Sequence, residues 1–159
     1  MEHNPKLDLV IQRELKASRA QLWKAWTIAE LLAQWWAPKP WQAQVVALDV
    51  RPMGAFSVAM MGPDGERFEG PGAFLHVEHQ RCIIWTSALD EGWRPVDKPD
   101  FPFTATITMD DHGGGSRYTA HVQHPTPELR QQHEQMGFME GWNTCISQLD
   151  ELALGLEEA

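Results

Sequence analysis

The sequence predicts an α+β fold in which a curved antiparallel sheet closes over a long C-terminal helix. An alternating apolar pattern over residues 7–15 precedes two helix-start signals. Alternating segments joined by turns then fill residues 42–124. A helical apolar stripe ends the chain, and only the sheet offers a surface broad enough to cover it. We therefore expect residues 1–159 to form a single domain.

The first strand is expected over residues 7–15, and two short helices should follow it. Ser18 with Gln21 and Thr27 with Glu30 each match the capping-box pattern, in which a hydroxyl and a side chain three residues later satisfy backbone groups at a helix start. Two nearby prolines should end the second helix.

The middle of the chain predicts a meander of further strands, which brings the total to about six or seven. Turn residues should separate them, and an internal Gly-Pro-Gly in the strand 68–77 predicts a bulge or an edge. The interruptions are expected at residues 52–54, 63–65, 70–72, 90–102 and 111–115.

A long helix should begin with Thr126 as N-cap and Pro127 in its first position. Its apolar side chains are spaced by three or four residues, so they share one side for about five turns. They are Phe138, Trp142, Cys145, Leu149, Leu152 and Leu156. At 100° per residue, Glu134 should fall about 40° from Phe138, on the apolar side.

Two glycines within this helix indicate that something approaches closely or that space is kept open, because each costs about 1 kcal/mol relative to alanine. Gly141 falls on the apolar side and Gly137 just outside it. One interpretation is a cavity between helix and sheet, with Glu134 as its polar anchor. The other is tight packing at the glycines, with Glu134 in water.

Tryptophan is the most unusual feature of the composition, with eight Trp against one Tyr. Most should lie in the core, but some should line a pocket, since such rings line sites for apolar ligands. Trp93 lies in a proline-rich loop and is a candidate for covering a pocket mouth.

Motifs for catalysis, metals or cofactors are weak. His133-Glu134 begins a zinc-protease pattern that fails at Gly137, and no phosphate loop, dinucleotide fingerprint or activated nucleophile is found. His121, His124 and His133 could hold zinc if they lay together; otherwise they are solvated or hydrogen-bonded. We therefore predict no catalytic set, no metal and no cofactor.

Charge and composition exclude several classes of partner. Lys plus Arg is 13 and Asp plus Glu is 22, which gives a net charge of −9. Such an excess of acid disfavours nucleic acid and anionic membranes. The chain has no long apolar run and no signal peptide, and its two cysteines make no disulfide framework. We expect a reduced, cytoplasmic protein.

Several segments resemble the START-like (SRPBCC) superfamily with its helix-grip fold. Within it the chain resembles the family homologous to the C-terminal domain of Aha-type activators of the 90-kDa heat-shock protein ATPase. The matching segments, in the family's order, are Leu22–Thr27, Leu32–Pro38, Asp49–Phe56, Pro63–Gly65 and Met136–Trp142, continuing to Gln148-Leu149. Met53 departs from the pattern, because the family often has there the first glycine of a pair.

The resemblance implies a hydrophobic cavity between the sheet and the long helix. Our main hypothesis is a protein that binds a small apolar ligand there, without established catalysis. The residues expected to line the site are Trp35, Phe56, Phe74, Trp85, Phe103, Glu134, Phe138, Gly141 and Trp142.

Two alternatives belong to other classes of protein. One is a stress-related co-chaperone that stimulates a heat-shock ATPase or associates as a dimer, although the relatives that do so carry a further N-terminal domain. The other is a polyketide-cyclase-type enzyme, for which Glu134 and His121 are the candidate acid and base.

Overall fold

The structure, a computed structural model, describes residues 2–157 and contains two principal antiparallel sheets and four α-helices. The five-stranded sheet has the order β1-β10-β9-β6-β5, and the three-stranded sheet has the order β2-β3-β4. The strands of the first are β1 (Asp8–Leu15), β5 (Ala73–Glu78), β6 (Cys82–Thr86), β9 (Thr104–His112) and β10 (Gly115–Gln123). Those of the second are β2 (Gln42–Leu48), β3 (Phe56–Met61) and β4 (Arg67–Phe68). The helices are α1 (Arg19–Thr27), α2 (Ala29–Leu32), α3 (Pro127–Gln135) and α4 (Phe138–Leu154).

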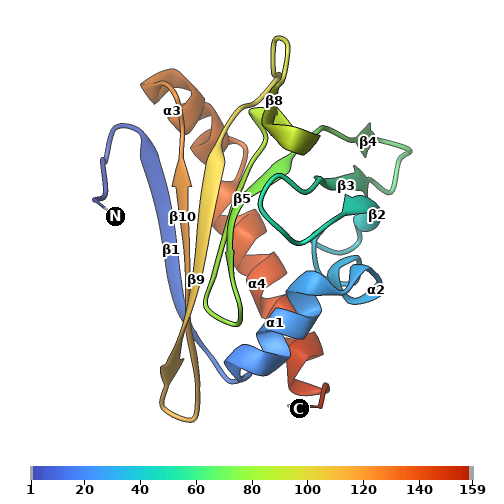
Figure 1. Cartoon of the computed structure of the whole chain (residues 1–159), viewed down its shortest axis with the longest axis vertical. Helices are drawn as coiled ribbons and strands as arrows, with labels where there is room; N and C mark the ends of the chain where they lie inside the picture. Colours follow the sequence, from blue (N-terminus) through green and yellow to red (C-terminus); the bar gives the residue numbers. More distant parts are fainter. Residues whose placement is uncertain (1, 158–159) are drawn as a thin grey trace.

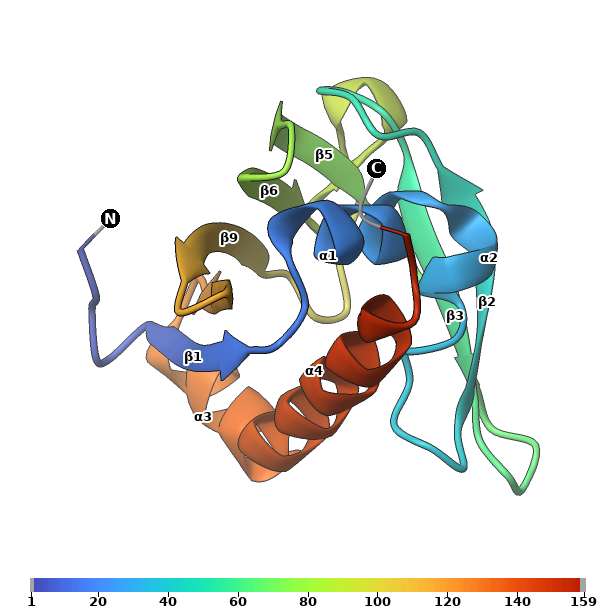
Figure 2. The ribbon, with the colours of Figure 1, turned by 90° about the horizontal axis from the view of Figure 1, so that it is seen from below.

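Helix α4 lies behind the five-stranded sheet (Figure 1), and the view from below shows the strands bending around it (Figure 2). In that view β1 lies on one side of α4, and β2 and β3 lie on the other. This arrangement confirms the α+β helix-grip fold. The predicted single sheet of about six or seven strands is instead divided into the five-stranded and the three-stranded sheet.

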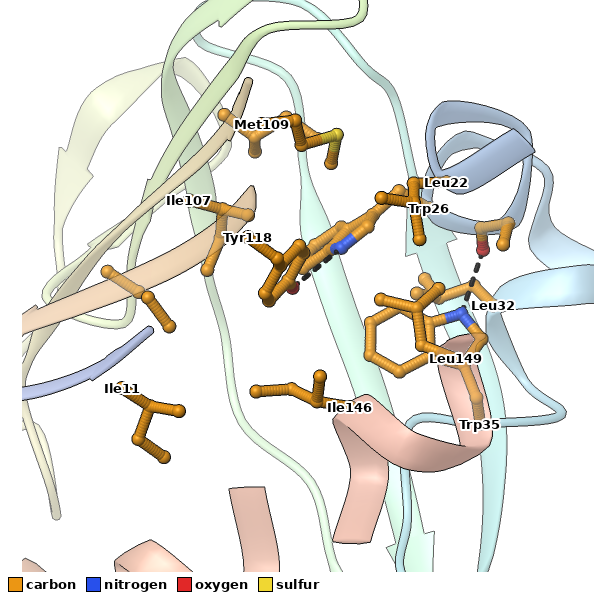
Figure 3. Packing of buried hydrophobic residues seen from close by; sticks show 14 of the residues in the cluster. Ile11, Leu22, Trp26, Leu32, Trp35, Ile107, Met109, Tyr118, Ile146 and Leu149 are labelled. Carbon is orange, nitrogen blue, oxygen red and sulfur yellow. Dashed lines mark hydrogen bonds between the residues drawn. The ribbon is translucent and has the colours of Figure 1, made fainter. Parts of the chain in front are cut away.

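The buried core lies where α1 and α4 meet the concave face of the large sheet (Figure 3). Ile107 and Tyr118 enter from the strands, and Ile146 and Leu149 enter from α4. Their burial follows from the predicted patterns, with every second residue of a strand and every third or fourth of a helix facing inward. Helix α4 is therefore anchored in the core through Ile146, Leu149 and Ala153.

One of the two predicted capping boxes is present. The Ser18 hydroxyl accepts from the Gln21 amide, and the Gln21 side chain accepts from the Ser18 amide. The second was wrong: the Thr27 hydroxyl donates to the Trp23 carbonyl, and Ile28 is the N-cap of α2 without a side-chain bond. Thr27 is the last residue of α1, where a carbonyl four residues earlier is within reach.

The interrupted strand 68–77 is two strands rather than one, and both are edge strands, so the expected edge is confirmed. Its halves, β4 and β5, belong to different sheets, and Gly70-Pro71-Gly72 spans the gap. A Cβ on Gly72 would lie 2.3 Å from the carbonyl oxygen of Phe56, so the close approach of the two backbones requires glycine. The loop that follows β6 also contains a small hairpin, β7 (Leu89–Asp90) with β8 (Arg94–Pro95), and the turn η1 (Glu91–Trp93).

The predicted single C-terminal helix is two helices. Thr126 caps α3 as expected, accepting from the Leu129 amide, with Pro127 following it. However, α3 ends at Gln135, and Gly137 has φ of +92° before α4 starts. This left-handed conformation breaks the helix, so the angular phase of α3 does not continue into α4.

Alanine at each of the two helix glycines should have opposite effects on stability. Gly137→Ala forces a Cβ into the left-handed region and should lower the free energy of unfolding by about 1 kcal/mol. Gly141→Ala, within α4 and with open space around its Cβ, should raise it by up to about 1 kcal/mol. Urea unfolding measures both, and equal effects would contradict the assigned break.

Candidate functional site

A cavity of about 540 Å³ lies between α4, the small sheet and the aromatic side chains of the large sheet. Its wall is almost wholly apolar, and within residues 2–157 no Asp, Glu, Lys or Arg lines it. The volume is in the range of sites for small organic ligands. The lining residues are Trp26, Trp35, Trp36, Pro38, Trp41, Phe56, Val58, Met60, Phe68, Gly70, Pro71, Trp85, Ser87, Phe101, Phe103, Tyr118, His133, Met136, Gly137, Phe138, Gly141, Trp142, Cys145 and Ile146.

Seven of the nine residues predicted for the site lie in this wall. They are Trp35, Phe56, Trp85, Phe103, Phe138, Gly141 and Trp142. Trp35 comes from the segment after α2, Phe56 from β3 and Trp85 from β6. Phe138, Gly141 and Trp142 belong to α4, which supplies one side of the cavity.

Two predicted residues lie outside the wall. Phe74 is 1% exposed and sits behind Phe56, with the two rings stacked at 4.9 Å. Glu134 is exposed on α3, where its carboxylate pairs with Arg130 at 3.1 Å. Its expected position assumed a continuous helix as far as Phe138, and the break at Gly137 invalidates that assumption.

Trp93 does not cover the mouth of the cavity. Its indole N–H donates to the carbonyl of Phe74 at 2.9 Å, which holds it against the end of β5. Phe68 and Met136 are the large apolar lining side chains that are exposed, by 58% and 67%, so we infer that the mouth lies beside them. Trp41, which stacks on Phe68 at 5.9 Å, extends this apolar rim.

The deep part of the cavity is a cluster of rings that meet mostly edge to face. Trp36 contacts Trp26 at 5.4 Å, Phe56 at 5.2 Å and Trp85 at 5.8 Å, measured between ring centroids. Such contacts are preferred over face-to-face sandwiches. Sequence reasoning missed Trp26 and Trp36 as lining residues, because the high Trp content does not distinguish core rings from those at a cavity.

Most polar groups in the wall already have partners. The Trp26 indole donates to the Tyr118 hydroxyl at 3.0 Å, and the Trp35 indole donates to the Ala25 carbonyl at 2.9 Å (Figure 3). Burial raises the pKa of the Tyr118 hydroxyl, and it raises the pKa of the Cys145 thiol to about 12. Both groups are therefore neutral, and Cys145 is a poor nucleophile.

The lining residue His133 pairs with His124, which lies outside the cavity wall. His124 Nδ1 lies 2.8 Å from the Leu7 carbonyl, and its Nε2 lies 2.9 Å from Nδ1 of His133. Burial lowers the pKa of His124, and burial together with His124 lowers the pKa of His133 to about 4. Both rings are therefore neutral at pH 7.

The third histidine lies elsewhere. His121 Nε2 contacts the Asp8 carboxylate at 2.8 Å and does not line the cavity. Within residues 2–157, no group of three or more His, Cys, Asp or Glu could hold a metal. The zinc arrangement considered from the sequence is therefore not formed. The acid–base pair considered for a cyclase, Glu134 with His121, is not brought together at the cavity either.

The helix-grip fold with its internal cavity places the protein in the START-like superfamily. Residues 16–153 match the family model described as Activator of Hsp90 ATPase homolog 1-like protein. The chain belongs to this family.

Solved structures show the same fold. The chain is similar to a protein from Nitrosomonas europaea at 42% identity, with a TM-score of 0.89 over 94% of this chain and 96% of that one. It is similar to a Mycobacterium smegmatis protein at 30% identity, with a TM-score of 0.80 over 98% and 96%. An AHSA1-like protein from Aeromonas hydrophila, 19% identical, shares the fold with a TM-score of 0.71 over 96% and 97%.

The search of curated proteins gave no match. Among the described residues, no helix has both the length and the apolar character needed to cross a membrane.

Proposed function

We propose that this protein binds a small apolar ligand in the cavity between the sheets and α4. The observation that carries the proposal is the cavity itself, about 540 Å³ with a wall of aromatic and aliphatic side chains. Transfer of an apolar molecule from water to such a wall is favourable by about 25 cal/mol per Å² of buried apolar surface. The apolar rim at Phe68 and Met136 gives the ligand a way in.

The glycine at position 141 supports the interpretation that the cavity is a binding space and not a defect in packing. An added Cβ at this position meets nothing within 4 Å, so glycine is not required there by a close neighbour. On α4, Gly141 lies about 40° from Cys145 and about 60° from Phe138, both of which line the cavity. A small residue at this place keeps space open at a cost in helix stability.

The first experiment is native mass spectrometry of freshly purified protein, compared with its denatured mass. An additional few hundred daltons lost on denaturation would identify a bound ligand. Titration of tryptophan fluorescence with naphthalene then tests the cavity directly, because Trp26, Trp35 and Trp36 lie in its wall. We expect saturable quenching.

Filling the cavity should abolish this binding. In Gly141→Phe, a ring occupies the space now open beside α4, and naphthalene affinity should fall at least about 100-fold, because a ligand would have to displace a packed ring. The matched control is Glu151→Phe, which puts the same ring on an exposed position of α4. Unchanged affinity in a folded Gly141→Phe variant would overturn the proposal.

A further inference from the structure

The proposed function leaves two polar groups of the cavity wall unexplained: the indole N–H of Trp85, which is buried without a partner among residues 2–157, and the imidazole of His133. His133 is 8% exposed, and its ring is surrounded by aromatic rings. Centroid distances are 4.9 Å to Phe101, 5.2 Å to Phe103, 4.9 Å to Phe138 and 6.3 Å to Trp142. If the wall bound only apolar molecules, an aliphatic or aromatic residue at this position would stabilise the protein more, since burying a polar group costs free energy.

The hydrogen bonds of the histidine pair fix which nitrogen of His133 carries its proton. The Leu7 carbonyl can only accept, so His124 must carry a proton on Nδ1. In neutral His124 the other nitrogen, Nε2, is then an acceptor, and His133 must donate to it from Nδ1. Neutral His133 therefore has an unprotonated Nε2 with a free lone pair.

This lone pair has no hydrogen-bond donor among the described residues. The two nitrogens of an imidazole diverge, so Nε2 points away from His124, and within residues 2–157 it is not among the fully buried side-chain atoms that lack a partner, so it is accessible. His133 itself lines the cavity. An acceptor is thus presented to the cavity, and it is an acceptor held in one protonation state.

From this geometry we infer that the cavity takes an apolar ring molecule bearing a hydroxyl group, which donates a hydrogen bond to Nε2 of His133. The inference rests on the proposed function and deepens it. A carboxylate would bring a second acceptor and an anion into a wall with no Lys or Arg, and an ammonium group would find no Asp or Glu. A neutral hydroxyl satisfies the acceptor without burying a charge.

Three probes of similar ring size distinguish the contribution of the hydroxyl group to affinity from that of the ring. Naphthalene has only the apolar ring, 2-naphthol adds a donor, and 2-methoxynaphthalene adds an oxygen that cannot donate. The measurement is the Kd of each by tryptophan fluorescence at pH 7.5, where 2-naphthol is neutral. We expect 2-naphthol to bind about three- to tenfold more tightly than the other two, the usual net value of one hydrogen bond.

His133→Phe should erase this preference while naphthalene and 2-methoxynaphthalene still bind, because the variant keeps an apolar ring but has no acceptor. His76→Phe, at an exposed position on β5, is the control and should keep the preference. Equal affinity of the native protein for all three probes would overturn the inference and leave the proposed function standing. Failure of all three to bind would overturn both.

A measurement on the native protein covers the case in which His133→Phe does not fold. Long-range ¹H–¹⁵N NMR spectra distinguish the imidazole tautomers, and we expect His133 to carry its proton on Nδ1. Addition of 2-naphthol should shift the Nε2 resonance, and 2-methoxynaphthalene should shift it much less. A proton on Nε2, or equal shifts with both probes, would contradict the assignment.

Discussion

Trp26→Ala is expected to lower the free energy of unfolding by about 3–5 kcal/mol, the range for removing a large buried aromatic ring. Trp26 is 2% exposed and contacts Trp35 at 5.2 Å and Trp36 at 5.4 Å between ring centroids. Its indole also donates to the Tyr118 hydroxyl, linking α1 to β10 across the core. The substitution therefore removes both ring contacts and a buried hydrogen bond.

Urea unfolding followed by circular dichroism checks this value. Trp26→Phe keeps most of the apolar contact but leaves the Tyr118 hydroxyl without its donor, so we expect a smaller loss of about 1–3 kcal/mol. Phe68→Ala, at a 58% exposed ring of the rim, should cost less than about 1 kcal/mol. A Trp26→Ala variant as stable as Phe68→Ala would show that the Trp26 ring is not part of the core.

The second large effect is a loss of stability at acid pH caused by His133. Its pKa falls from 6.5 to about 4 on folding, because burial and the neighbouring His124 disfavour the charged ring. Between these values the unfolded chain binds more protons than the folded one, so the free energy of unfolding decreases as the pH falls from about 6.5 to about 4. The full contribution is about 3 kcal/mol, and it is absent above pH 6.5.

A comparison of variants separates the contribution of His133 to acid destabilisation from that of Asp and Glu side chains, which also titrate in this range. In His133→Gln the side chain keeps an N–H that can donate to His124, but it does not titrate. We expect the difference in unfolding free energy between native protein and variant to shift by about 3 kcal/mol between pH 7.5 and pH 4. His76→Gln, at an exposed histidine, should follow the native curve. Parallel curves for native protein and His133→Gln would show that His133 does not lose its charge on folding.

The fold could be predicted because its signals are local and agree with one another. The capping box of Ser18, the cap of Thr126 and the alternating strands each depend on a few neighbouring residues. The division into two sheets could not be predicted in the same way. The chain passes from one sheet to the other at Gly70-Pro71-Gly72, and the contact that joins the sheets there, between Gly72 and Phe56, spans sixteen positions and gives no periodic signal.

The candidate site also shows that local patterns predict positions within one element better than contacts between elements. Residues on the stripe of α4, such as Phe138 and Trp142, were placed correctly because the helix around them is regular. The predicted position of Glu134 is wrong because the left-handed residue Gly137 ends the helical phase, so side chains on α3 do not share the face of those on α4. From the sequence alone, His133 is only a weak zinc candidate. Its importance comes from burial and from a bond to His124, and neither can be derived from spacing.

The contact between the two sheets has a consequence for how the cavity can open. The small sheet and the turn before β3 meet the large sheet through a bridge between Ala55 and Ala73 and three backbone hydrogen bonds. In these bonds the Met53 amide donates to the Phe74 carbonyl, the Phe74 amide to the Gly54 carbonyl and the Phe56 amide to the Gly72 carbonyl. The large sheet, by contrast, has continuous ladders packed on α4. Separation at this contact breaks few bonds, so it costs a fraction of the global free energy. We therefore expect local opening at this contact to be easier than global unfolding, and the proposed ligand would enter and leave by this route.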